Sequence, residues 1–458
     1  MSIAPAACRL CHEQAQTPLL PLNGGAVARS ATDGVFAQLK QNCPQWLFCN
    51  SAAITPPRAF GAALPIEGRA ANFGRQSWKA TPMIPFIDLQ AQRARIADKI
   101  DAAIARVLAH GQFIFGPEVK ELEGQLAEFA QAKHCVANAN GTDALVLPLW
   151  AWGVGEGDAV FTPSFTFAAT AEIVPWVGAT PVFVDVLADS YNMDPKSLEA
   201  AIAGVKKDGK LKPKAVIAVD LFGQPADYPA LQAICNREGL KLIADSAQSY
   251  GCTLGGKHPM AWADAQTTSF FPAKPLGCYG DGGATLTNSD DDNVMMRSLA
   301  FHGASGDDKY NCASIGMNSR LDTIQAAILI EKLAIFADEI RARNEIADRY
   351  AHMLEGLVQT PRVIEGGVST WAQYVIEADS RDALAAHLRE AGIPTAQYYP
   401  KPLHKQTAYE TFPIGAGGLQ VSERIAHRVL ALPMHPYLGG QTQTKIANAI
   451  RDFVKAGA

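Results

Sequence analysis

The sequence predicts an α/β fold, with a large domain built on a mainly parallel sheet and a smaller α+β domain at the C-terminus. Short apolar segments alternate with segments of helical length between residues 159 and 244. Strands that alternate with helices in this way form parallel sheets. A long helical pattern over 321–354 follows, and the remaining residues place few strands among helices. This change of pattern predicts the second, smaller domain.

The first helices follow from the spacing of their apolar residues. Ile96, Ile100 and Ile104 lie four positions apart, which is typical of an amphipathic helix, and Gly111 is expected to end it. Pro117 follows Gly116 and fits the first turn of a second helix, because its missing N–H needs no partner there. Further helices are expected near 168–177, 198–203 and 228–238, and strands at 159–162, 181–186, 215–221 and 240–244.

The second half of the chain contains the predicted domain boundary. A strand pair is expected at 266–271 and 283–287, before the long helix of 321–354. We place the boundary inside that helix, with 83–335 as the large cofactor-binding domain and 336–458 as the small one. Residues 1–82 show no regular period and few acidic residues, which predicts a disordered leader or translated upstream sequence. The small domain is expected to have a strand at 371–377 and helices at 381–391, 422–430 and 442–454.

The composition is that of an ordinary globular protein. The 458 residues are 48% hydrophobic and carry a formal net charge of −5, so nucleic acid and anionic membranes are not expected partners. No apolar run reaches the roughly 18 residues that a membrane-spanning helix needs. The nine cysteines are odd in number and irregularly spaced, which favours reduced thiols and a cytoplasmic location.

A carboxylate and a lysine follow two neighbouring predicted strands. Asp245 ends an apolar strand, and Lys274 lies 29 positions later in a turn rich in Gly and Pro. This pair suits pyridoxal 5'-phosphate, an aldehyde that forms a Schiff base with a lysine amine and whose ring nitrogen a carboxylate keeps protonated. We therefore predict that Lys274 is the catalytic lysine and that Asp245 binds the ring nitrogen. Apolar neighbours of Lys274 are expected to lower the pKa of its amine; they are Phe270, Phe271, Pro272 and Leu276.

Five further residues could complete a site for this cofactor. Gly141 and Thr142 stand at the start of a predicted helix, where exposed N–H groups favour a phosphate. Ser269 ends the strand before Lys274 and can reach the same phosphate. The ring of Phe167, at a strand-to-helix junction, could stack on the pyridine ring. Gln248 could hydrogen-bond the ring hydroxyl. Taken singly, each of these residues also fits a structural role.

Six motifs occur in one order along the chain: FIDL at 86–89, GPE at 116–118, NGTDAL at 140–145, DSAQ at 245–248, KPLG at 274–277 and GMNSRLD at 316–322. With these motifs the chain, from about Met83 to the C-terminus, resembles the DegT/DnrJ/StrS family of sugar-nucleotide aminotransferases. The resemblance implies the fold of the pyridoxal-phosphate-dependent transferases of fold type I, which is aspartate aminotransferase-like.

Within this family, residues 110–119 and 270–283 are most similar to a branch that acts on UDP-2-acetamido-2-deoxy-3-oxo-D-glucuronate. The similarity implies that glutamate donates an amino group to the 3-keto group of this sugar, for surface polysaccharides such as the lipopolysaccharide O-antigen. It also implies a homodimer with shared active sites, in which Asn318 reaches the cofactor phosphate of the partner subunit. Arg320 and His404 are the implied substrate contacts, since a guanidinium can bind a carboxylate through two hydrogen bonds. His404 fits a structural role equally well.

Three alternatives stay open at this point. The chain could aminate C4 of a dideoxy-4-keto nucleotide sugar, because only pocket residues would differ. A non-catalytic regulator that binds a nucleotide sugar is disfavoured by the intact lysine, carboxylate and phosphate-site residues. A sugar 3-dehydratase of the same fold uses a histidine in place of the lysine, so Lys274 argues against it.

Overall fold

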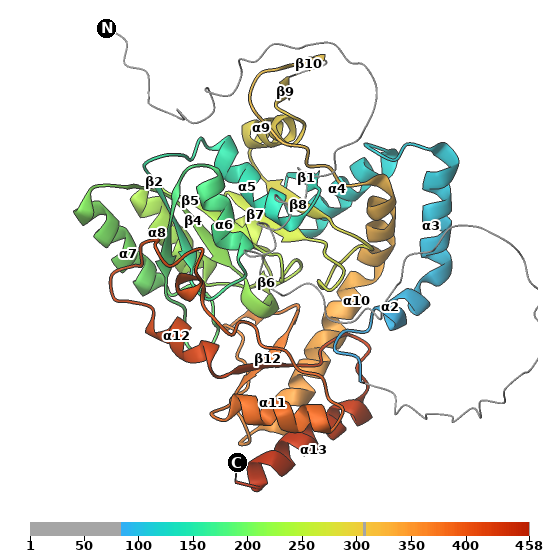
Figure 1. Ribbon diagram of the computed structural model, residues 1–458. Coiled ribbons are helices and arrows are strands. Elements are labelled where there is room, and N and C mark those ends of the chain that lie inside the picture. Colours follow the sequence, from blue (N-terminus) through green and yellow to red (C-terminus); the bar gives the residue numbers. More distant parts are fainter. Residues whose placement is uncertain (1–83, 306–307, 458) are drawn as a thin grey trace, which may run out of the picture. The chain divides into compact units, whose positions relative to one another are not determined.

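The computed structural model describes residues 84–305 and 308–457, and its main feature is a seven-stranded sheet flanked by helices (Figure 1). Its strand order is β1-β8-β7-β5-β4-β2-β3. Strand β8 runs antiparallel to both of its neighbours, and every other neighbouring pair is parallel. The predicted mainly parallel sheet is therefore confirmed. The strands are β1 (His134–Asn138), β2 (Asp158–Pro163), β3 (Thr180–Val184), β4 (Lys212–Val219), β5 (Lys241–Asp245), β7 (Ala265–Ser269) and β8 (Gly283–Thr287).

Helices cover both faces of this sheet (Figure 1). Val216 and Ala218 of β4 pack with α7 (Pro195–Asp208) and α8 (Tyr228–Glu238). The alternate residues Ala215 and Ile217 pack with α5 (Gly141–Ala151) and α6 (Ala169–Trp176). Burial on both faces explains why residues 215–219 of β4 are apolar without interruption, as is typical of parallel strands. The other helices before the long one are α2 (Leu89–Arg95), α3 (Ala97–His110), α4 (Pro117–Phe129) and α9 (Asp290–Ala300).

Several predicted element ends coincide with those in the structure. Helix α3 ends before Gly111, which has a left-handed φ of 72° and donates its N–H to the carbonyl of Val107. Helix α4 begins at Pro117. The predicted helix of 228–238 and strand of 283–287 are α8 and β8. These ends could be predicted because glycine and proline favour backbone conformations that begin or end helices and strands.

Helix α10 (Thr323–Leu354) is 32 residues long and contributes to four apolar clusters, of which the two larger ones lie at different points along it. Leu329, Phe336 and Ile340 pack with α4 and with strands β1 and β8. Ile346 and Tyr350, further along the helix, pack among the C-terminal elements. The division of the chain at residue 335 stays a prediction, and the first cluster extends past that residue.

The C-terminal elements surround a two-stranded antiparallel sheet of β12 (Tyr374–Glu377) and β13 (Val429–Leu432). The helix predicted over 422–430 is wrong in its second half, because the helix ends at Ala426 and β13 begins at Val429. A short apolar run such as 429–432 suits a buried helix or a buried strand equally, and here pairing with β12 decides. The helices of this part are α11 (Arg381–Glu390), α12 (Gln420–Ala426) and α13 (Gly440–Lys455).

Short elements complete the described residues: β6 (Thr253–Leu254), β9 (Ala304–Ser305), β10 (Asp308–Cys312), β11 (Gly367–Val368), η1 (Leu221–Gly223), η2 (Pro259–Ala261) and η3 (Leu403–Lys405). Within the part of the chain that the structure describes, no helix combines the length and apolar character needed to cross a membrane. The leader predicted over 1–82 lies outside the described residues.

Candidate active site

Asp245 is the last residue of β5, at the carboxyl end of the parallel strands, where ligands of such sheets bind. Its side chain is buried. It accepts a hydrogen bond from Thr170 Oγ1 of α6 at 2.8 Å and one from the N–H of Ala247 at 3.2 Å. Burial raises the pKa of Asp245, while these two hydrogen bonds and the charge of Lys274 oppose that change. The carboxylate is thus fixed in orientation and interacts with Lys274.

Lys274 lies in the turn between β7 and β8, and its backbone N–H donates to the carbonyl of Phe271 at 2.8 Å. Burial lowers the pKa of its amine, and the Asp245 carboxylate raises it in part. Phe270 and Leu276 are buried as expected, whereas the Phe271 side chain is 52% exposed. The apolar surround is therefore less complete than the sequence suggests, but the structure does bring Lys274 and Asp245 together.

Gly141 and Ser269 are in direct contact. Gly141 is the first residue of α5, and Asn140 caps that helix by accepting a hydrogen bond from the N–H of Asp143 at 2.8 Å. A Cβ atom on Gly141 would lie 2.6 Å from Ser269 Cβ and 3.1 Å from Ser269 Oγ. The half-buried Thr142 follows in the same turn. Free N–H groups and two hydroxyls thus gather at one helix start, which suits a phosphate group.

Strand β8 makes this contact possible. Its first residue, Gly283, pairs with Asn138 of β1 on one side and with Ser269 of β7 on the other. A Cβ atom on Gly283 would lie 2.4 Å from the carbonyl oxygen of Asn140. Because Gly283 has no side chain, the segment that leads from β1 into α5 can pass close to β8, and so next to Ser269 at the end of β7.

Phe167 and Gln248 lie next to Tyr399. The Phe167 side chain is 57% exposed, and its ring centroid is 6.4 Å from that of Tyr399, so much of the ring is accessible to a ligand. The buried Gln248 accepts a hydrogen bond from the N–H of Phe222 at 2.7 Å and donates to the Tyr399 hydroxyl at 3.0 Å. Protein groups thus occupy its oxygen and one of its two amide hydrogens. A cofactor hydroxyl could use the second.

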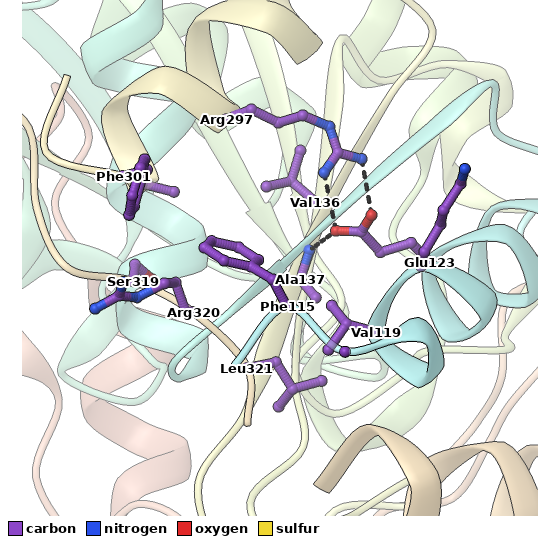
Figure 2. A pocket seen from close by; sticks show the side chains of 13 residues that line it. Phe115, Val119, Glu123, Val136, Ala137, Arg297, Phe301, Ser319, Arg320 and Leu321 are labelled. Carbon is purple, nitrogen blue, oxygen red and sulfur yellow. Dashed lines mark hydrogen bonds and ion pairs between the residues drawn. The ribbon is translucent and has the colours of Figure 1, made fainter. Parts of the chain in front are cut away.

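Arg320 lines a pocket of about 440 Å³ (Figure 2). Its guanidinium packs against the rings of Phe115 and Phe301, at 5.8 and 5.4 Å from the ring centroids. Across the pocket, Arg297 binds Glu123 through two hydrogen bonds of 3.1 and 2.9 Å (Figure 2). Among the described residues, no carboxylate forms an ion pair with Arg320. Its donors are therefore available to an acidic ligand.

Asn318 precedes this arginine on the same segment and is exposed. The neighbouring Ser319 accepts a hydrogen bond from the N–H of Ala139 at 3.1 Å, which ties the segment to the chain that leads into α5. The structure thus places the segment of Asn318 beside the phosphate-site residues of its own chain. Whether Asn318 reaches a partner's phosphate stays a prediction.

His404 is buried in η3, and both of its ring nitrogens have protein partners. Nδ1 lies 2.6 Å from Ser164 Oγ, and Nε2 lies 3.0 Å from a carboxylate oxygen of Glu423. This arrangement favours the structural interpretation of His404. Its role as a substrate contact stays a prediction.

Sequence reasoning missed three groups that support the site. Thr170 binds Asp245, and Tyr399 binds Gln248; nothing in their sequence context marks them. Asp220 lies buried beside Asp245. It lies inside the strand predicted over 215–221, although the observed strand β4 ends at Val219. An acidic residue within an otherwise apolar predicted strand was the usable signal.

Comparison with known proteins identifies the family. The sequence profile described as the DegT/DnrJ/EryC1/StrS aminotransferase family matches residues 94–451. The chain belongs to this family. Family membership confirms the expected fold type I architecture and the transaminase activity that the motifs predict.

Two relatives of the family are especially similar over most of their length. UDP-2-acetamido-2-deoxy-3-oxo-D-glucuronate aminotransferase of Pseudomonas aeruginosa is 49% identical over 357 residues, which are 78% of this chain and 96% of that protein. A DegT DnrJ EryC1 StrS aminotransferase from Brucella abortus, known from a crystal structure, is 54% identical with a TM-score of 0.80. The match covers 81% of this chain and 99% of the Brucella chain.

Aminotransferases of this family depend on pyridoxal phosphate. NtdA of Bacillus subtilis, solved with bound pyridoxamine phosphate, is 28% identical with a TM-score of 0.73 over 81% of this chain and 85% of its own. The residues of the present site fit such a group. A Cβ at Gly141 would fill the phosphate position against Ser269, the exposed ring of Phe167 can cover one face of the pyridine, and Asp245 and Lys274 interact at the inner end.

Proposed function

We propose that the chain transfers an amino group from glutamate to the 3-keto group of UDP-2-acetamido-2-deoxy-3-oxo-D-glucuronate. The observation that carries the proposal is the joint presence of the Lys274–Asp245 pair and a guanidinium, Arg320, without an acidic partner among the described residues. The 49% identity to the Pseudomonas enzyme of that name supports the choice of sugar. The product would serve surface polysaccharides such as the lipopolysaccharide O-antigen.

The site residues divide the chemistry among them. Bound pyridoxal phosphate supplies an electrophilic carbon and a ring that withdraws electrons. Because burial lowers the pKa of the Lys274 amine, this amine can take up a proton at Nζ and return it, as a general base and acid must. Asp245 would hold the ring nitrogen, where an ionised carboxylate stabilises positive charge. Gly141 and Ser269 would hold the phosphate and so position the cofactor relative to Lys274.

Arg320 would select for acids. Its guanidinium is held against two aromatic rings and can give two parallel hydrogen bonds to a carboxylate, either of the sugar acid or of glutamate. If Arg320 binds the sugar rather than glutamate, a C4 keto-sugar that lacks a carboxylate would leave these donors unused. In that case the arginine favours the glucuronate sugar over the C4 alternative.

We further propose a cytoplasmic homodimer with shared active sites. Asn318 is exposed at the edge of the site, where a second subunit could present its own cofactor phosphate. The described cysteines are unpaired and four of the five are buried, which suits a reducing compartment.

Product analysis by mass spectrometry tests the proposal. Purified protein with glutamate and the 3-oxo UDP-glucuronate is expected to form the 3-amino sugar and 2-oxoglutarate, and a 4-keto dideoxy sugar nucleotide to react far more slowly. Lys274→Ala should abolish turnover, whereas Lys257→Ala, which changes an exposed lysine, should not. Faster reaction at C4 would refute the assignment of the sugar. Tight sugar-nucleotide binding with no product would instead favour the regulator.

A further inference from the structure

A second buried carboxylate lies next to Asp245. Asp220 follows β4, which is the parallel neighbour of β5, and its N–H donates to the carbonyl of Asp245 at 3.1 Å. The Asp220 side chain is completely buried. Nothing in the chemistry proposed above uses this charge, so its presence in the interior needs a reason of its own.

Asp220 has an unusually full set of donors. Oδ1 accepts from the N–H of Ala226 and from the Tyr228 hydroxyl, both at 2.8 Å. Oδ2 accepts from the hydroxyls of Ser246 at 2.9 Å and Ser249 at 2.8 Å, and Cys252 Sγ lies 3.7 Å away. Burial raises the pKa of Asp220 to about 6 in spite of these donors. Above that pH the ionised carboxylate can accept all of the hydrogen bonds, whereas an amide could not.

Two of these donors are the sequence neighbours of Asp245 and Gln248. Ser246 immediately follows Asp245, and Ser249 immediately follows Gln248. The N–H of Ser249 also donates to the carbonyl of Ser246 at 3.1 Å, so residues 246–249 form a turn closed by a hydrogen bond. The segment of Asp220 contacts this turn once more, because the N–H of Phe222 binds the side-chain oxygen of Gln248.

We propose that Asp220 is a positioning residue, whose carboxylate holds the Asp245–Ser249 turn so that Asp245 and Gln248 are aimed at the cofactor ring. Asp220 itself touches neither cofactor nor substrate; it acts through Ser246 and Ser249. The proposal rests on the cofactor assignment but is independent of which keto-sugar is aminated. A failure of the sugar assay therefore leaves it standing, and cofactor binding alone decides it.

The test compares Asp220→Asn with a matched control, Asp185→Asn. Asp185 is also a buried carboxylate beyond a strand end, but its donors come from α12 and from its own neighbour Val186. They are the N–H of Val421 at 2.9 Å, the N–H of Ser422 at 2.8 Å, the Ser422 hydroxyl at 2.7 Å and the N–H of Val186 at 3.0 Å. Both variants remove one buried charge. Only Asp220→Asn should loosen the turn that carries Asp245.

Cofactor-free protein is titrated with pyridoxal phosphate at pH 8, and binding is followed by absorbance and intrinsic fluorescence. We expect Asp220→Asn to weaken binding about tenfold and to shift the absorbance of the saturated complex. Asp185→Asn should lower the thermal midpoint but leave affinity within about twofold and the spectrum unchanged. Equal affinity in Asp220→Asn and the parent, or an equal loss in both variants, would overturn the proposal.

Variants of Ser246 and Ser249 provide a second test of the proposal, which can be used if Asp220→Asn does not fold. Ser246→Ala and Ser249→Ala each remove one hydrogen bond to Asp220, and each is expected to weaken cofactor binding roughly two- to fivefold. Where Asp220→Asn does fold, adding Ser249→Ala to it should cost little more, since both act through one contact. Full affinity in both serine variants would overturn the proposal, and so would additive losses.

Discussion

The backbone at Gly141 approaches Ser269 so closely that a methyl group on the glycine would lie 2.6 Å from Ser269 Cβ. The start of helix α5 therefore lies directly against Ser269 at the end of strand β7, with room for no side chain on Gly141. This contact sets the distance between the expected phosphate position and Lys274, five residues beyond Ser269.

Gly141→Ala is expected to weaken pyridoxal phosphate binding at least tenfold, or about 1.4 kcal/mol. The new methyl group must push the helix start away from Ser269 and so widens the phosphate site. Titration of the cofactor-free variant measures the loss. Gly124→Ala is the control, because a Cβ at this glycine inside α4 meets nothing within 4 Å. It should bind the cofactor normally and gain slightly in stability.

Phe167→Ala should weaken cofactor binding roughly two- to tenfold, because ring stacking contributes about 0.5–1.5 kcal/mol. The 57% exposed ring contributes little to the apolar core, so the thermal midpoint of the cofactor-free protein should hardly change. Trp176→Ala removes a similarly exposed aromatic at the end of α6. If both variants lose the same affinity, the stacking role of Phe167 is wrong.

Arg320→Met is expected to raise KM for an acidic substrate roughly ten- to hundredfold, since a hydrogen bond to a charged group is worth about 1.5–3 kcal/mol. Steady-state kinetics with glutamate and the sugar acid varied in turn will show which carboxylate the arginine binds. Lys120→Met removes another cation that lines the same pocket. It should leave both KM values within about twofold.

Because His435 is buried, we expect the folded protein to lose stability in mild acid. The side chain is buried with no hydrogen-bond partner for either ring nitrogen among the described residues, and burial lowers its pKa from 6.5 to about 4. Between these values the unfolded chain binds a proton that the folded chain excludes. The free energy of unfolding should therefore fall by about 2 kcal/mol from pH 7.5 to pH 5 through this group.

Urea unfolding at the two pH values, with His435→Gln beside the parent protein, isolates this contribution. The variant is expected to lose about 2 kcal/mol less on acidification. His427→Gln, at an exposed histidine, should behave as the parent does. The same pH dependence in parent and His435→Gln would rule out His435 as the cause.

The proximity of Asp245 and Lys274 could be predicted from the sequence, but most of the contacts that hold the residues of the site in place could not. Asp245 and Lys274 follow successive strands, and parallel strands bring their carboxyl ends to one edge of a sheet. The contact of Gly141 with Ser269 depends on β8 lying antiparallel between β1 and β7, which no local pattern encodes. Asp220 follows β4, whereas Asp245 is the last residue of β5. The role of Asp220 depends on serine hydroxyls that carry no periodic signal.

Helix α10 has a mechanical consequence. It spans about 48 Å at 1.5 Å per residue and packs into the first apolar cluster through Leu329 and into the C-terminal one through Tyr350. Near its start, Gln325 accepts a hydrogen bond from the N–H of Tyr279, in the turn that carries Lys274, at 2.9 Å. A tilt of the helix by only about 5° about one end would therefore displace its other end by about 4 Å. We therefore expect a disturbance among the C-terminal helices to reach the turn that carries Lys274, unless the helix itself bends.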